Sequence, residues 1–205
     1  MNELKPSDLT VGGIINNAFK IALENLGAII GASFLWIITI WIPYINIGTT
    51  IGLYGIIVML SKGEKPNATE IFNSKYRKFM GEFFLLLAFS FLGILFGMYL
   101  FIIPGIVLTL AWSQAFYLLI DKEINPMDTL KISNQITYGK KWTIFGGMFL
   151  LLLILYIPLL VIFWILAKVS GLLAILILIL GYIFIACIIF GADAYIYKEL
   201  SKRLE

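Results

Sequence analysis

Two long apolar runs constrain what this chain can fold into more than any other feature. Residues 83–103 and 142–167 contain no Asp, Glu, Lys or Arg. About 20 consecutive apolar residues cross a bilayer as a helix, which satisfies its own backbone hydrogen bonds there. The period-two alternation of a transmembrane barrel strand is absent from these runs. The runs therefore predict an all-α integral membrane protein.

Composition supports this prediction and narrows the chemistry. Of the 205 residues, 61% are hydrophobic and 13% are charged, whereas soluble domains carry about 25% charged residues. The chain has no His and one Cys, Cys187, which lies in an apolar run as a small core or lipid-facing residue. A disulfide within the chain is therefore impossible, and a His-based or thiolate metal site is not expected. We predict no enzyme activity, no catalytic residue, no metal and no cofactor. The net charge of +3 reflects lysines near a membrane surface, so no nucleic-acid partner is predicted.

Breaks between the apolar runs define six predicted transmembrane helices, at residues 26–42, 47–60, 83–103, 106–120, 142–167 and 172–190. Pro43, Pro104-Gly105 and residues 168–171 would join them in pairs, and Pro158 would kink the fifth. Pro6, Pro66 and Pro126 recur at a spacing of 60 residues. Each would open a polar helix followed by a hairpin, which gives units 1–60, 61–120 and 121–205 within one domain, residues 1–205. This pseudo-threefold repeat has two open explanations, common ancestry of the units and a recurrent hairpin length.

Each polar interval is predicted to form an amphipathic helix at the cytoplasmic membrane surface. Residues 6–24 have one apolar face, although they could also begin the first span. Residues 67–80 show the clearest pattern, because Asn67-x-x-Glu70 resembles a capping box before an apolar arc. Residues 125–138 begin with an Asn125 cap and Pro126 at the first helical position. Their apolar residues lie on two faces, which suits burial between membrane and protein.

The distribution of charge predicts the topology. All Lys and Arg residues except Lys168 fall on one side of the six predicted spans. The positive-inside rule then places both termini and the surface helices in the cytoplasm. Lys-, Ile- and Asn-rich usage favours a prokaryote and hence its cytoplasmic (inner) membrane. No signal-peptide core is visible near Met1, so the first span is expected to act as an uncleaved targeting signal. Basic residues near the surface attract anionic lipids by about 1 kcal/mol each, and the predicted lipid-surface residues are Lys75, Arg77, Lys78, Lys140, Lys141 and Trp142.

Few polar residues are predicted inside the spans. Ser113 and Gln114 lie at the middle of the fourth span, and Asp193 lies near the cytoplasmic end of the sixth. An amide without a partner costs several kcal/mol in lipid, so Gln114 is expected to bond another helix or to contact a substrate. Asp193 is either a helix-end residue or an ion site. The small residues of Gly48-x3-Gly52 would allow close helix packing.

Residues 101–147 resemble a known family. They combine Ile-Pro-Gly-Ile, a short span, an acidic turn, a Leu-Lys-x-Ser helix and Gly-Lys-Lys-Trp-x-x-Phe. This order is similar to the membrane domain fused to some glycerophosphoryl diester phosphodiesterases and to the YciC-like family of small bacterial inner-membrane proteins. The resemblance extends over about residues 70–150 and implies a polytopic fold without an established activity, since the phosphodiesterase chemistry belongs to a separate soluble domain. The matching positions are Ile103, Pro104, Gly105, Asp121, Leu130, Lys131, Ser133, Gly139, Lys141, Trp142 and Phe145.

Three functions remain open at this point. The first is a non-enzymatic inner-membrane protein that organises or senses lipid, or assists a partner complex, through its basic surface helices. The second is a small oligomeric transporter or channel with a path near Gln114, lined by the second and fourth spans. The third is a processing enzyme or an immunity factor. Membrane lipids are the predicted partners in the first case, with a second copy or another membrane protein as a further possibility.

Overall fold

The computed structural model describes residues 6–204, and every regular element in that range is a helix. The all-helical fold predicted from the apolar runs is confirmed. The α-helices are α1 (Val11–Glu24), α2 (Leu26–Thr39), α3 (Pro43–Ser61), α4 (Met80–Leu100), α5 (Ile102–Trp112), α6 (Ala115–Lys122), α7 (Pro126–Thr137), α8 (Lys141–Ala167) and α9 (Gly171–Ser201). Short 3-10 helices are η1 (Ala68–Phe72), η2 (Ser74–Phe79) and η3 (Lys202–Leu204).

Several of these helices are compatible with a membrane protein. Among the described residues, five helical segments are long and apolar enough to cross a membrane. They are Pro43–Ser61, Ser74–Leu100, Ile102–Lys122, Lys141–Ala167 and Gly171–Leu204. A sixth is obtained only if α1 and α2, which are bent by 78° at their junction, are counted together. The structure thus supports five or six such helices.

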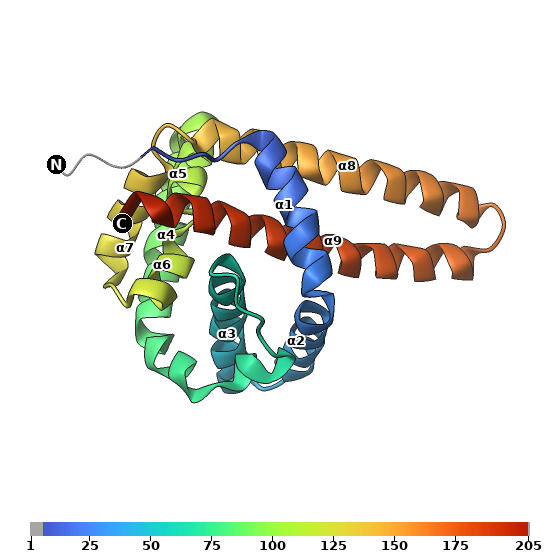
Figure 1. Cartoon of the computed structure of the whole chain (residues 1–205), viewed down its shortest axis with the longest axis horizontal. Coiled ribbons are helices and arrows are strands. Elements are labelled where there is room, and N and C mark those ends of the chain that lie inside the picture. The colour runs from blue at the N-terminus through green and yellow to red at the C-terminus, as the bar shows by residue number, and fades with distance from the viewer. Residues whose placement is uncertain (1–5, 205) are drawn as a thin grey trace.

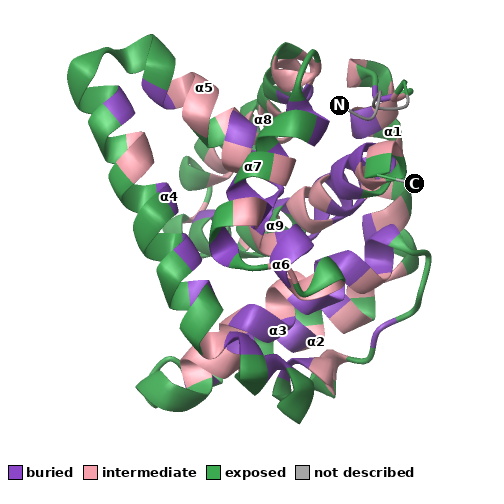
Figure 2. Cartoon of the chain, turned by 90° about the vertical axis from the view of Figure 1, so that its left-hand side faces the viewer, coloured by how far each residue is buried: buried purple, intermediate pink, exposed green. Residues whose placement is uncertain are grey.

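The helices meet in a common body from which two hairpins extend. Figure 1 shows α8 and α9 side by side as one long hairpin, with α1 crossing α9. The second hairpin, α4–α5, is largely exposed along its outer part (Figure 2). The core lies where α1, α3, α6, α7 and the second half of α9 meet, and it includes Ile14, Ile56, Leu118, Ile136 and Ile188.

Helix α1 begins later than predicted and is separate from α2. Thr10, and not the Pro6-Ser7-Asp8 stretch, caps it, because its Oγ1 accepts from the Gly13 N–H at 3.0 Å. The buried face of α1 consists of Ile14, Ala18 and Ala22. A Cβ on Gly191 of α9 would lie 3.1 Å from the Ala22 nitrogen, so the crossing of α1 over α9 depends on that glycine.

The predicted first span, residues 26–42, is shorter than expected. Helix α2 has 14 residues and rises about 21 Å, which is less than the roughly 30 Å of a hydrocarbon core. Hydroxyl groups tie it to α3: Trp36 Nε1 donates to Thr50 Oγ1 at 2.8 Å, and the Thr39 and Thr49 hydroxyls are 2.8 Å apart. The α2–α3 pair is therefore a hairpin with polar contacts between its helices.

The glycines of α3 pack against the segment that follows it in the chain, from η1 to the start of α4. A Cβ on Gly52 would lie 2.6 Å from the Ile71 backbone, and one on Gly55 would overlap the Tyr76 ring. The close helix packing that Gly48-x3-Gly52 predicts is therefore found, with η1 against Gly52 and Met80 of α4 against Gly48. Segment 68–80 crosses the middle of α3.

Residues 67–80 do not form the single amphipathic helix that was predicted. Instead η1 and η2 meet at Asn73, whose backbone is extended and whose side chain caps η2. Asn67 caps η1 as predicted, but Glu70 does not reach back to it. The Glu70 carboxylate accepts from Asn73 Nδ2 at 3.2 Å and from the Tyr76 hydroxyl at 3.3 Å. Asn side chains compete with helical hydrogen bonds, and here Asn73 interrupts the helix.

Pro104-Gly105 opens a helix and does not form the predicted turn between spans. Helix α4 ends at Leu100, and Phe101 alone joins it to α5. Pro104 lies in the first turn of α5, where its missing N–H costs nothing. A Cβ on Gly105 would lie 2.8 Å from the Met98 nitrogen, so this glycine allows the close approach of α5 to α4.

The predicted fourth span, residues 106–120, is interrupted at Ser113 and Gln114, between α5 and α6. Ser133 of α7 bonds both sides of the interruption. Its Oγ donates to the Ala111 carbonyl at 2.7 Å and accepts from the Gln114 N–H at 3.3 Å. A side chain of α7 thus replaces helical hydrogen bonds that the interruption removes.

Helix α7 is confirmed with its predicted N-terminal cap. Asn125 Oδ1 accepts from the Asp128 N–H at 3.0 Å. Hydrogen bonds from the Asn125 amide and from Lys131 hold the pKa of Asp128 below its ordinary value. The predicted burial on two faces is only partly found. The buried residues are Pro126, Thr129, Leu130, Ser133, Ile136 and Thr137, whereas Met127 and Tyr138 are exposed.

Helices α8 and α9 match the predicted fifth and sixth spans most closely. Helix α8 runs through Pro158 as one element, and α9 continues beyond its apolar part to Ser201. Between them, Lys168 Nζ lies 3.5 Å from the centroid of the Trp164 ring, a cation–π contact.

The pseudo-threefold repeat is not confirmed. The three polar intervals form a 14-residue α-helix, two 3-10 helices and a 12-residue α-helix. The hairpins also differ, because α8 and α9 have 27 and 31 residues whereas α2 and α3 have 14 and 19. The division into units 1–60, 61–120 and 121–205 remains a prediction.

Candidate functional site

A cavity of about 240 Å³ surrounds Asp193, one of the sequence-predicted polar residues. Four elements enclose it: α2, α3, α6 and α9. Its lining is mostly aromatic and aliphatic, and Asp193 contributes the one carboxylate. The lining residues are Trp36, Thr50, Leu53, Tyr54, Ile57, Tyr117, Phe190 and Asp193.

Asp193 has a hydroxyl partner but no cationic one. The Tyr117 hydroxyl donates a hydrogen bond to its carboxylate. None of the ion pairs among residues 6–204 includes Asp193. A carboxylate within a protein body costs several kcal/mol in desolvation unless a counter-charge compensates it. The site therefore holds an acidic group that has no counter-ion among residues 6–204.

Aromatic rings form the walls of the cavity and hold one another in place. The Tyr54 ring stacks on Phe116 with centroids 5.2 Å apart and lies 5.6 Å from the Tyr117 ring. The Trp36 ring is fixed by its hydrogen bond to Thr50. Aromatic pairs at these distances have favourable geometry, so the walls are preorganised.

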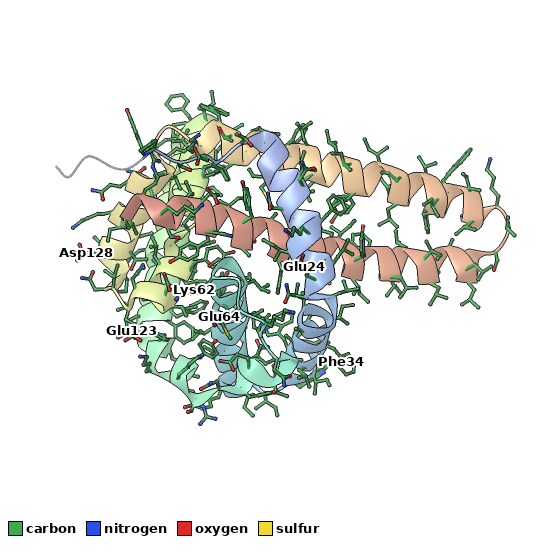
Figure 3. The ribbon with its side chains drawn as sticks, viewed as in Figure 1. Glu24, Phe34, Lys62, Glu64, Glu123 and Asp128 are labelled. Carbon is green, nitrogen blue, oxygen red and sulfur yellow. The ribbon has the colours of Figure 1, made fainter. Side chains whose placement is uncertain are left out.

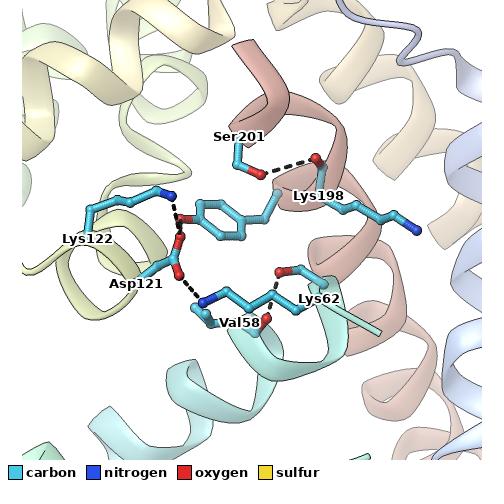
Figure 4. A network of polar contacts seen from close by, with 8 residues as sticks. Val58, Lys62, Asp121, Lys122, Lys198 and Ser201 are labelled. Atoms are coloured by element: carbon cyan, nitrogen blue, oxygen red, sulfur yellow. Dashed lines mark hydrogen bonds and ion pairs between the residues drawn. The ribbon is translucent and has the colours of Figure 1, made fainter. Parts of the chain in front are cut away.

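A second polar group, centred on Asp121, adjoins the cavity through two tyrosines. The Tyr117 and Tyr197 rings are 5.6 Å apart, and the Tyr197 hydroxyl donates to Asp121 Oδ2 at 2.7 Å. Asp121 also pairs with Lys62 and, at 3.5 Å, with Lys122 (Figure 4). Contacts therefore run from Asp193 to the half-exposed Lys62 at the C-terminal end of α3.

Ser113 and Gln114, near which the alternative transport path was predicted, do not line this cavity. Gln114 is 1% exposed and is absent from the cavity lining. Its Nε2 donates to Ser113 Oγ at 3.0 Å, and its Oε1 has no partner among the described residues. The expected bond to another helix exists, but the Gln114 backbone makes it, with Ser133 of α7.

The predicted lipid-surface residues mostly have partners within the chain. Lys75 pairs with Glu70 at 2.5 Å and Lys78 with Glu123 at 2.6 Å. Lys140 donates to the Leu9 carbonyl at 3.0 Å, and Lys141 donates to Asn134 Oδ1 at 2.8 Å. Trp142 is 66% exposed. Arg77, also exposed, lines a different cavity.

Sequence reasoning found Asp193 but missed Trp36, Tyr54 and Tyr117. A weak signal existed, because a tyrosine in an apolar run needs a partner for its hydroxyl. Nothing in the sequence indicated that the three rings would converge, since they lie on three helices and α6 is far from α2 and α3 along the chain. Across residues 6–204, no three His, Cys, Asp or Glu side chains are grouped so that they could hold a metal ion.

Fold and site together define the class: an all-helical protein with five or six helices able to span a membrane and an acidic, aromatic cavity between them. Comparisons with protein-family models, curated proteins and solved structures give no match for this chain. The resemblance to the YciC-like family and to the phosphodiesterase membrane domain therefore stays a prediction.

Proposed function

We propose that this chain is a non-enzymatic, multi-pass protein of a prokaryotic cytoplasmic membrane that binds a small organic cation in the Asp193 cavity. The single observation that carries the proposal is the Asp193 carboxylate, which has no counter-ion in the described part of the chain and lines a cavity walled by aromatic rings. This proposal develops the transporter alternative from the sequence analysis, with the site at Asp193 in place of Gln114.

The chemistry of the lining favours a cation over an anion or a neutral solute. Ring faces carry partial negative charge, and a desolvated cation over such a face gains about 2 kcal/mol. A carboxylate adds direct attraction, whereas it would repel an anion. A neutral solute would leave the charge of Asp193 uncompensated. An ammonium group with small apolar substituents satisfies both the carboxylate and the rings.

The proposed topology keeps both termini in the cytoplasm. A hairpin returns the chain to the side that it left, so the location of the termini is the same whether or not α2–α3 crosses the membrane. The six spans predicted from the sequence form three hairpins if α2–α3 crosses, and four spans in two hairpins remain if it does not. Membership in the YciC-like family is part of this proposal. Oligomers and protein partners remain compatible with it.

A second candidate function is lipid association, which the exposed apolar surface favours. Trp41 at the end of the α2–α3 hairpin is 88% exposed, and Trp142 beside Lys141 is 66% exposed. Tryptophans of this kind concentrate at membrane interfaces. Lipid association and cation binding use different surfaces and are compatible in one protein.

Calorimetric titration of the full chain in detergent with tetramethylammonium tests the cation site. We expect a dissociation constant of about 0.1–10 mM, since the probe is very small. Asp193→Asn should weaken binding at least about tenfold, which corresponds to about 1.4 kcal/mol. The matched control is Asp128→Asn, which removes a half-exposed carboxylate on α7 and should bind as the wild type does.

A neutral ligand of similar size shows whether binding depends on the charge of the ligand or only on its shape. The alcohol tert-butanol resembles the probe in size but lacks its charge, so we expect it to bind much more weakly than tetramethylammonium. Equal binding of the two ligands, or an Asp193→Asn protein with wild-type affinity, would contradict the proposal.

Uptake of tetramethylammonium into proteoliposomes then decides between transport and binding alone. If the protein transports, Asp193→Asn should abolish uptake, whereas Gln114→Leu should leave it unchanged because Gln114 does not line the cavity. If Gln114→Leu abolished uptake and Asp193→Asn did not, the transport path would lie near Gln114, as predicted from the sequence.

A further inference from the structure

A second cavity, of about 300 Å³, lies beside the first half of α3. Tyr44, Ile45 and Gly48 of α3 form one side of it. Phe72 and Asn73, from the junction of η1 and η2, and Arg77 form the other. Among the residues that the structure describes, no Asp or Glu lines this cavity. It combines an apolar floor with one guanidinium group.

Arg77 is separated in space from the two lysines beside it in the sequence. Lys75 and Lys78 line another cavity, together with Glu64, Asp121 and Glu123. Both lysines form ion pairs, whereas no ion pair among residues 6–204 includes Arg77. The positive charge of Arg77 is therefore uncompensated by the described part of the chain.

Helix α3 is buried in one half and exposed in the other. From Ile51 to Ser61 most of its residues are buried, including Ile56, Ile57 and Leu60. The opposite end of the hairpin is exposed and apolar. Figure 3 shows Phe34 on the outer side of α2, and it is 62% exposed. The other exposed apolar residues of this end are Ile37 (55%), Ile38 (54%), Trp41 (88%), Ile42 (52%) and Tyr44 (66%).

The position of Arg77 makes a full crossing by α2–α3 costly. Met80 packs on Gly48 and Tyr76 on Gly55, so Arg77 lies beside the middle and first half of α3. If α3 crossed a bilayer, this charge would lie within the hydrocarbon layer, beside the first half of the helix, which is unfavourable. A hairpin inserted only by its exposed end places Arg77 at the level of the lipid headgroups instead. The 78° bend between α1 and α2 suits such a shallow hairpin.

We propose that the exposed end of the α2–α3 hairpin inserts into one leaflet and that Arg77 binds the phosphate of an anionic phospholipid. Ile45 and Phe72 would contact the adjacent part of its acyl chain. A guanidinium group matches a phosphate oxygen pair in geometry and charge. The absence of acidic residues from the cavity lining favours a headgroup with net negative charge. This inference rests on the proposed lipid association, and it is independent of the Asp193 cavity.

Native mass spectrometry of the full chain released from mixed micelles tests the headgroup site. The probes are phosphatidylglycerol and phosphatidylcholine of the same acyl chains. We expect Arg77→Gln to lower retention of phosphatidylglycerol about fivefold. Lys75→Gln makes the same change of charge two residues away, and it should retain the lipid as the wild type does because Lys75 is already paired with Glu70.

The outcomes separate the site from general lipid association. If the wild type shows no preference for phosphatidylglycerol, lipid association by charge fails as a whole. If the preference exists and Arg77→Gln retains it, only the Arg77 site is refuted. Equal losses in both variants would mean a diffuse charge effect and would also overturn the site.

Insertion of the hairpin end is tested separately in vesicles that contain lipids brominated near the headgroup. We expect strong quenching of tryptophan fluorescence, and Trp41→Phe should remove a large part of the quenched signal. Deeply brominated lipids should quench Trp41 less. Quenching of Trp41 that is strongest for the deeply brominated lipids, or is absent, would overturn shallow insertion.

Discussion

Ser133→Ala should destabilise the protein more than its loss of one oxygen atom suggests. The hydroxyl is fully buried, donates to the Ala111 carbonyl at 2.7 Å and accepts from the Gln114 N–H at 3.3 Å. Both backbone groups lost their helical partners where α5 and α6 are interrupted. A buried group left without a partner costs about 1–3 kcal/mol. The Thr137 hydroxyl lies 3.4 Å from the Ala111 carbonyl, so it can replace part of the hydrogen bonding that this carbonyl loses.

The expected decrease in the free energy of unfolding is therefore about 2–3 kcal/mol. For a chain of this length this corresponds to a midpoint lower by about 4–12 °C. Thermal unfolding in detergent, followed by tryptophan fluorescence, measures the midpoint, and Trp112 adjoins the interruption. Ser201→Ala is the matched control, because Ser201 only donates to the Lys198 carbonyl within α9 and should change stability by less than about 0.5 kcal/mol. Equal midpoints for the two variants would refute the role assigned to Ser133.

Two further predictions concern packing and charge. Gly55→Ala places a methyl group in the Tyr76 ring and should lower the free energy of unfolding by about 1–3 kcal/mol. Gly12→Ala, where the space is open, should instead stabilise α1 by about 0.5–1 kcal/mol. The thermal midpoints of the two variants check this, and a Gly55→Ala protein as stable as the wild type would contradict the crossing of segment 68–80 over α3. Asp121→Asn removes the ion pair with the half-exposed Lys62 and should lower the free energy of unfolding by about 1–2 kcal/mol. The same measurement of the thermal midpoint checks it, and an unchanged midpoint would show that this ion pair adds no stability.

Much of the fold could be predicted because it follows from local chemistry. Apolar runs as long as residues 142–167 have few alternatives to a helix, and the cap of α7 is encoded within the tetrad that begins at Asn125. The prediction for residues 67–80 failed because a helical wheel assumes a continuous helix, whereas Asn73 bonds the backbone locally and interrupts it. The interruption at Gln114 also could not be predicted, since Ser133, which makes it tolerable, lies in another helix.

The residues of the candidate site could be predicted only in part, for a related reason. Asp193 stands out in the sequence because it is acidic and follows a long apolar run. Trp36, Tyr54 and Tyr117 look like ordinary members of apolar helices, and only the tertiary packing brings them together. The predicted path near Gln114 was based on polarity alone, which does not determine the face of a helix on which a cavity forms.

The most direct test of the cation site is a crystal structure of the protein with tetramethylarsonium, whose arsenic atom can be located by anomalous scattering. The account predicts an anomalous peak inside the cavity, within about 6 Å of the Tyr54 ring centroid and next to the Asp193 carboxylate, and no such peak in Asp193→Asn crystals. A peak elsewhere on the protein with an empty Asp193 cavity, or a peak in this cavity that persists in the Asp193→Asn protein, would contradict it.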